Sequence, residues 1–146
     1  MKGKLVAILG IVLILVMAGA CARGAEASKD VSVIVPVDEF AAAKNVAKTV
    51  EINPGEELVV ILGSNPSTGY SWTETAQIGD GAVIAQTGHN YVAPGQTSEP
   101  VVGAAGHERW TFDPLAAGTT KITMKYSRPW ETVPAEWNFE LTVVVK

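Results

Sequence analysis

The order of apolar and polar residues along the chain predicts short β-strands from residue 31 onward. Three inner segments show the alternation of a strand with one buried face: residues 57–63, 108–113 and 121–126. The last segment alternates most clearly, with five apolar residues on one face: Trp137, Phe139, Leu141, Val143 and Val145. Weaker strands are expected over residues 32–37, 48–52, 70–75 and 82–86.

Residues that favour turns separate these segments. The turns are expected at five places: Asn53-Pro54-Gly55, Asn65-Pro66, Pro94-Gly95, Asp113-Pro114 and Ala117-Gly118. Only residues 38–47 are compatible with a helical turn. Seven or eight short strands in sequence predict an all-β, immunoglobulin-like β-sandwich over residues 31–146. We expect Trp72 in its core, and apolar burial rather than a disulfide to stabilise it.

The first thirty residues have a different character. Lys2 and Lys4 precede an apolar run over residues 5–20, which is typical of an export signal. The run is about 16 residues long, whereas a membrane-spanning helix needs roughly 20. Because Cys21 directly follows Ala18-Gly19-Ala20, the segment resembles the lipobox of exported lipoproteins, although Ala18 stands where that motif prefers leucine.

The resemblance divides the chain into three parts. We expect residues 1–20 to be a signal peptide, residues 21–30 to be a lipidated Cys21 followed by a tether, and residues 31–146 to be the folded domain. The protein is then exported and faces outward on a cell membrane, or is periplasmic or extracellular. An uncleaved anchor and an ordinary signal peptide with an incidental cysteine are the alternatives.

Composition and charge exclude several classes of function. The net charge of −4 argues against nucleic-acid binding, which needs clustered Lys and Arg to neutralise phosphates. A single cysteine excludes a disulfide framework, a Cys-rich zinc site and an iron–sulfur cluster. The two histidines, His89 and His107, form no His-x-x-x-His pair, so neither a metal nor another cofactor is expected.

The sequence also lacks the pairs of residues on which catalysis depends. A nucleophile or base needs an orienting partner, and neither histidine has one nearby in the sequence. His107 and Glu108 are adjacent, so on a strand they point to opposite faces. We therefore expect both histidines in exposed loops and predict that the protein is not an enzyme. There is no Gly-x-Ser-x-Gly elbow, phosphate-binding loop or dinucleotide-binding fingerprint.

Three predicted loops have unusual residues. The first is Asn65-Pro66-Ser67-Thr68-Gly69-Tyr70, whose proline and glycine hold a small polar tip stiff. The second is Gly103-Ala104-Ala105-Gly106, which has so little side chain that it can lie along another backbone. The third is Arg128-Pro129-Trp130, which combines residue types that dominate binding sites with a stiffening proline.

Each loop alone has a simpler interpretation: a turn, a flexible connection, and a tryptophan folded onto the edge of the sandwich. In this order, however, the three resemble the chagasin family of cysteine peptidase inhibitors. That family carries Asn-Pro-Thr-Thr-Gly-Tyr, a glycine-rich loop and Arg-Pro-Trp, and the resemblance covers residues 52–146. Ser67 and Ala105 replace a threonine and a glycine of the family pattern, and residues 90–100 are an additional stretch.

The resemblance implies a function and a set of partners. It implies an immunoglobulin-like domain whose three loops enter the active-site cleft of papain-like cysteine peptidases, reversibly and without a covalent bond. Thr68 would lie nearest the catalytic thiolate, and residues 103–106 would run along the substrate cleft. Trp130 would pack on an aromatic surface beside the catalytic histidine, supported by Arg128.

Two other functions compete with inhibition. A surface-anchored immunoglobulin-like adhesion module would also display loops, but it would not compete with a small active-site inhibitor of a peptidase. A purely structural envelope lipoprotein would tolerate substitutions in all three loops. An enzyme is the least favoured alternative and would show turnover.

Overall fold

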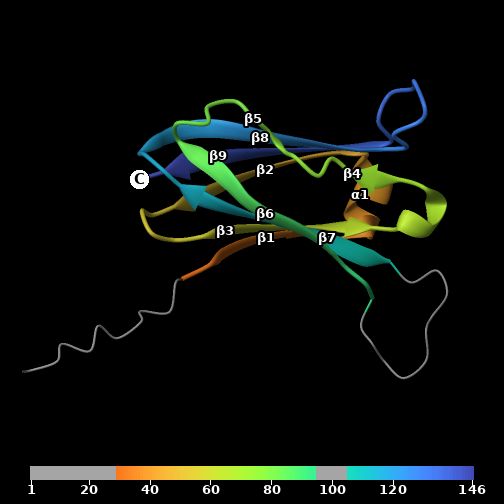
Figure 1. The fold of residues 1–146 in the computed structure, drawn as a ribbon, viewed down its shortest axis with the longest axis horizontal. Coiled ribbons are helices and arrows are strands. Elements are labelled where there is room, and N and C mark those ends of the chain that lie inside the picture. Colours follow the sequence, from red (N-terminus) through yellow and green to blue (C-terminus); the bar gives the residue numbers. More distant parts are fainter. Residues whose placement is uncertain (1–28, 95–104) are drawn as a thin grey trace, which may run out of the picture.

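Two β-sheets packed face to face form the protein (Figure 1), in a computed structural model that describes residues 29–94 and 105–146. The first sheet has the order β1-β3-β7-β6, with these bounds: β1 (Val31–Val35), β3 (Leu58–Ser64), β7 (Gly106–Pro114) and β6 (Ile84–Val92). The second has the order β2-β9-β8-β4, and β5 also pairs with β8: β2 (Asn45–Ile52), β9 (Trp137–Val145), β8 (Gly118–Ser127), β4 (Ser71–Trp72) and β5 (Gln77–Ile78). The predicted all-β sandwich is confirmed, but the described residues form nine strands instead of seven or eight, and two of the nine are only two residues long.

A short helix carries the chain from the first sheet to the second. Helix α1 (Val37–Ala43) lies between β1 and β2, each of which pairs in parallel with its neighbour. It ends at Ala43, and the next residue, Lys44, has a positive φ of 53° and donates its N–H to the carbonyl of Phe40 at 2.7 Å. Strand β2 therefore begins at Asn45, three residues before the predicted strand, and only the first part of 38–47 is helical.

The apolar rows predicted from alternation are buried in β3, β7, β8 and β9. Leu58, Val60 and Leu62 are fully buried, as are Phe139 and Leu141 of β9. Trp137, at the start of the same row, is half-buried. Placing apolar rows from both sheets inside the sandwich removes them from water, which is the main stabilising contribution in a domain without a disulfide.

The predicted core tryptophan is confirmed. Trp72 is 2% exposed, and its indole Nε1–H donates to the carbonyl of Gly63 at 2.9 Å. Gly63 itself lies under the start of α1, because a Cβ at this position would lie 2.5 Å from the backbone nitrogen of Val37. Strand β3 therefore contacts both the helix and the tryptophan of the second sheet.

Several further details of the sequence prediction were wrong. Only Ser71–Trp72 of the expected strand over residues 70–75 form a strand, and Asp113-Pro114 end β7 instead of forming a turn. Both histidines lie in strands rather than in exposed loops: His89 in β6 and His107 in β7. The predicted strand over residues 82–86 begins later and is longer, because β6 starts at Ile84 and pairs with β7 up to Val92 across a bulge between Gln86 and Gly88. Pairing with a distant strand extends β6 beyond what its own weak alternation indicates.

The predicted signal peptide, Cys21 and most of the tether lie outside the described residues. Within residues 29–94 and 105–146, no helix has the length and apolar character needed to cross a bilayer.

Candidate functional site

The first predicted loop follows β3 as a tight, hydrogen-bonded turn. Residues Pro66–Thr68 form one turn of 3₁₀-helix, which Gly69 ends with a left-handed φ of 81°. The carbonyl of Asn65 accepts hydrogen bonds from the backbone N–H of Thr68 at 3.2 Å and from its hydroxyl at 2.7 Å. Ser67 donates to the side chain of Asn65 at 2.6 Å, so both exposed hydroxyls of the tip are held in place.

The third predicted loop follows β8 and exposes its tryptophan. Trp130 is 68% exposed, an unusual degree for the largest apolar side chain. Glu131 donates its backbone N–H to the carbonyl of Arg128 at 3.1 Å, which closes a turn around Pro129 and Trp130. The carboxylate of Glu131 accepts from the Arg128 guanidinium at 2.9 Å, and this hydrogen bond raises the pKa of Arg128. Because most of its side chain is exposed, Trp130 is not folded back onto the sandwich edge.

The first and third loops contact each other although some sixty residues separate them. Arg128 Nε–H donates to the carbonyl of Thr68 at 3.2 Å, and its guanidinium lies 4.4 Å from the ring centre of Tyr70. A Cβ added to Gly69 would lie 2.7 Å from Cη2 of Trp130. The two loops therefore form one surface, and only glycine at position 69 allows both the left-handed backbone and the contact with the indole.

A stack of aromatic rings supports this surface from below. Tyr70 stacks on Tyr126 at 5.5 Å, Tyr126 on Trp137 at 4.5 Å, and Trp137 on Phe40 of α1 at 5.5 Å. The hydroxyl of Tyr126 also accepts the backbone N–H of Asn65 at 2.9 Å. Because aromatic side chains have few rotatable bonds, the stack holds the base of the loops rigidly.

Only the last two residues of the second predicted loop lie within the described part of the chain. Gly103 and Ala104 lie outside the described residues, while Ala105 is exposed and Gly106 is the first residue of β7, not a loop residue. Gly106 pairs with Ser64, the last residue of β3, so it lies at the end of the sandwich that carries the first loop. It is glycine because a Cβ would collide with the hydroxyl of Tyr91 and lie 2.6 Å from the carbonyl of Val92.

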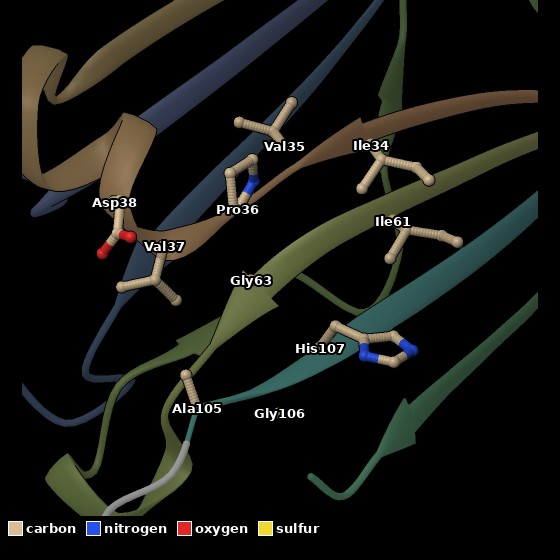
Figure 2. Close-up of a pocket in the computed structure, with 10 residues that line it drawn as sticks. All are labelled: Ile34, Val35, Pro36, Val37, Asp38, Ile61, Gly63, Ala105, Gly106 and His107. Atoms are coloured by element: carbon tan, nitrogen blue, oxygen red, sulfur yellow. The ribbon is translucent and has the colours of Figure 1, made fainter. Parts of the chain in front are cut away.

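A shallow pocket opens beside this end, on the outer face of the first sheet. It encloses about 340 Å³. Figure 2 shows the side chains of Ile34, Ile61 and His107 on neighbouring strands in its wall, with Ala105 at one side. The lining residues include no serine, threonine or cysteine, and the described part of the chain holds no group of three metal-binding side chains.

Sequence reasoning missed a buried polar cluster behind the first loop. Glu108 is 4% exposed; its Oε2 lies 2.9 Å from Nε2 of His89, and its Oε1 accepts from the hydroxyl of Ser64 at 2.8 Å and from the backbone N–H of Trp72 at 3.2 Å. A signal was present, because alternation places Glu108 on the same face as the buried Trp110. The carboxylate lies between the hydroxyl and the imidazole, so the order of groups differs from the hydroxyl–imidazole–carboxylate order of a catalytic triad.

Binding and catalytic residues are often placed on exposed loops that a rigid scaffold such as this β-sandwich positions. Comparison with known families defines the protein further. The family described as "Chagasin family peptidase inhibitor I42" matches residues 51–143, and the chain belongs to this family, whose members are peptidase inhibitors and not enzymes.

Individual relatives agree with this assignment. Amoebiasin-1 of Entamoeba histolytica is 32% identical over 98 residues, covering 67% of this chain and 90% of the relative. Chagasin of Trypanosoma cruzi is 29% identical over 100 residues, covering 67% and 87% respectively. Among solved structures, the cysteine protease inhibitor EhICP2 of Entamoeba histolytica is similar with a TM-score of 0.62 and 25% identity, over 80% of this chain and 97% of that one.

Proposed function

We propose that the protein is a reversible, non-covalent inhibitor of papain-like cysteine peptidases that inserts its three loops into the active-site cleft. Membership of a family of peptidase inhibitors supports inhibition, and the relative EhICP2 is named as a cysteine protease inhibitor. The observation that carries the proposal is the contact between the tip of the first loop and Trp130, which gives one exposed wedge from two loops.

The geometry of the first loop suits an inhibitor that is not cleaved. Papain-like peptidases bind extended substrate backbone, whereas residues 66–68 form a helical turn. In the proposed complex Thr68 lies nearest the catalytic thiolate, where its hydroxyl remains bonded to the carbonyl of Asn65. Because no peptide bond is presented in an extended conformation, the thiolate is covered without being supplied with a substrate.

The other two loops would extend the contact on either side. Residues 103–106 would run along the substrate cleft, where the small side chain of Ala105 and the glycines permit close approach. Trp130 would pack on an aromatic surface beside the catalytic histidine of the peptidase. Its exposed indole already lies against Gly69, so little conformational entropy is lost on binding.

We also propose that the inhibitor is exported and attached to the outer face of a membrane through a lipid on Cys21. The apolar run over residues 5–20 and the small residues before Cys21 support this proposal. Mass spectrometry of the N-terminal peptide from the native host tests it. A diacylated peptide beginning at Cys21 is expected, and an unmodified peptide that retains residues 1–20 would contradict it.

Titration of papain tests the function directly. A soluble chain beginning at residue 22 should abolish turnover of a small fluorogenic substrate at concentrations below about 1 μM, since standard-size preorganised interfaces bind in this range or tighter. A covalent active-site inhibitor added first should prevent the complex from forming. Papain that keeps full activity at roughly tens of micromolar of this protein would instead favour the adhesion module. Equal binding to papain with a free and with a blocked active site would do the same.

A further inference from the structure

Glu108 occupies a position where an apolar side chain would be expected. It lies in the buried row of β7 that continues with Trp110 and Phe112, and both of these side chains are fully buried. Removing a carboxylate from water costs several kcal/mol, and replacing buried ionic groups by apolar residues is often neutral or stabilising. The acid is therefore poorly explained as a contribution to stability alone.

The partners of Glu108 indicate what it does. Its Oε1 accepts from the hydroxyl of Ser64, the last residue of β3, and from the backbone N–H of Trp72 in β4. These two residues lie immediately before and just after the Asn65–Tyr70 loop. One oxygen atom of a third strand thus joins both ends of the loop.

The two ends also belong to different sheets. Strand β3 is in the first sheet and β4 is in the second, so the loop crosses from one layer of the sandwich to the other. Backbone pairing within a sheet does not hold such a crossing, because the hydrogen bonds of a sheet join strands in the same layer. The carboxylate supplies a link across this crossing, beside the hydrogen bond from Trp72 Nε1–H to the carbonyl of Gly63, and His89 of β6 holds its second oxygen at 2.9 Å.

From this arrangement we infer that Glu108 is a positioning residue that clamps the ends of the Asn65–Tyr70 loop and keeps it in the non-cleavable turn. The inference rests on the proposed function insofar as the loop is the part that meets the peptidase. Glu108 does not touch the target, since it is buried beneath the loop. Its effect is to prevent the loop from extending into a substrate-like conformation.

Three variants of the full domain separate this role from a general contribution to stability. Glu108→Leu keeps the approximate volume but removes both acceptor oxygens, whereas Glu108→Gln keeps one acceptor for Ser64 and Trp72 and turns a donor toward His89. Val143→Ala is the control, because it truncates a fully buried side chain of β9, six positions along the strand from Trp137. Thermal unfolding of each variant shows how much stability is lost.

Papain inhibition and loop cleavage are then measured together. Glu108→Leu should inhibit at least about tenfold more weakly and be cut by papain between residues 64 and 72, because the freed loop has to be ordered on binding. Glu108→Gln should remain within about threefold of the wild type and stay intact, because neutral hydrogen bonds replace the charged ones. Val143→Ala should lose stability yet inhibit normally, and an equal loss of inhibition in this control would overturn the inference.

If the wild-type protein fails to inhibit papain, the proposed function is refuted, but the inference about Glu108 can still be tested. The test is amide hydrogen exchange in the absence of peptidase. Residues 65–72 of Glu108→Leu should exchange faster than those of the wild type, while the amides of β9 do not change beyond the difference in stability. Unchanged exchange in the loop would overturn the clamp. If Glu108→Leu does not fold, Ser64→Ala removes one of the two links and is measured in the same way.

Discussion

Gly69 lies directly against the indole of Trp130, so closely that a Cβ at position 69 would lie 2.7 Å from Cη2 of the tryptophan. The same glycine has a φ of 81°. One residue without a side chain thus permits both the end of the 3₁₀ turn and the contact between two loops.

Gly69→Ala should therefore weaken inhibition of papain by about tenfold or more, because the indole has to move and the turn is strained. The matched control is Gly55→Ala, which has the same kind of backbone strain at a φ of 85° but meets nothing within 4 Å. Both substitutions should cost about 1–2 kcal/mol of stability, and only Gly69→Ala should raise the inhibition constant. Equal inhibition constants for the two variants would contradict the role of the contact.

Trp130→Ala should weaken binding by about 2 kcal/mol, or roughly thirtyfold, as expected for an anchor that is exposed in the free protein and buried in the complex. Since Trp130 is 68% exposed, the melting temperature should hardly change. Leu115→Ala is the control, because Leu115 is 60% exposed and lies beyond the far end of β7 from the loops. A normal inhibition constant for Trp130→Ala would remove this residue from the binding surface.

Arg128→Lys should also weaken inhibition, although the charge is kept. Lysine has no Nε–H at the position that donates to the carbonyl of Thr68, and its ammonium does not lie flat on Tyr70 as the guanidinium does. We expect a loss of about threefold to tenfold, measured as an increase in the dissociation rate by surface plasmon resonance. The matched variant Lys125→Arg changes an exposed cation of β8 and should have no effect. Retention of full affinity by Arg128→Lys would show that charge alone matters.

The turn between β2 and β3 should be sensitive to pH. The pKa of Glu56 is lowered from its ordinary 4.5, mainly because its carboxylate accepts the backbone N–H of Asn53 at 2.8 Å. A lowered folded-state pKa contributes stability above the unfolded pKa, and this contribution is lost as the pH falls through the folded pKa. Glu56→Gln should therefore melt slightly below the wild type at neutral pH, and the two curves should converge as the medium is acidified below pH 4.5. A difference that persists in acid would assign the effect to something other than this carboxylate.

The alternation of apolar and polar residues predicts a strand correctly where that strand has one continuous apolar face. The last strand was predicted with its observed bounds, because its apolar face is continuous from Trp137 to Val145. The histidines were predicted in loops because the alternation around them is weak. Both lie in strands, since β6 and β7 are held together by eight backbone pairs. Glu108 was overlooked because its partners, Ser64, Trp72 and His89, come from three other strands.

The sequence alone therefore determined the class of fold, the order of the loop motifs and the resemblance to a family of inhibitors, since these depend on the two-residue period of a strand and on short motifs that are contiguous in the chain. Only the tertiary structure decided that Trp130 rests on Gly69, that Arg128 joins the first loop to the third, and that one buried carboxylate holds both ends of the first loop. These contacts join residues between 36 and 61 positions apart, and such pairs meet only after the strands have been packed together. Packing depends on the shape of the whole core, which no single segment contains.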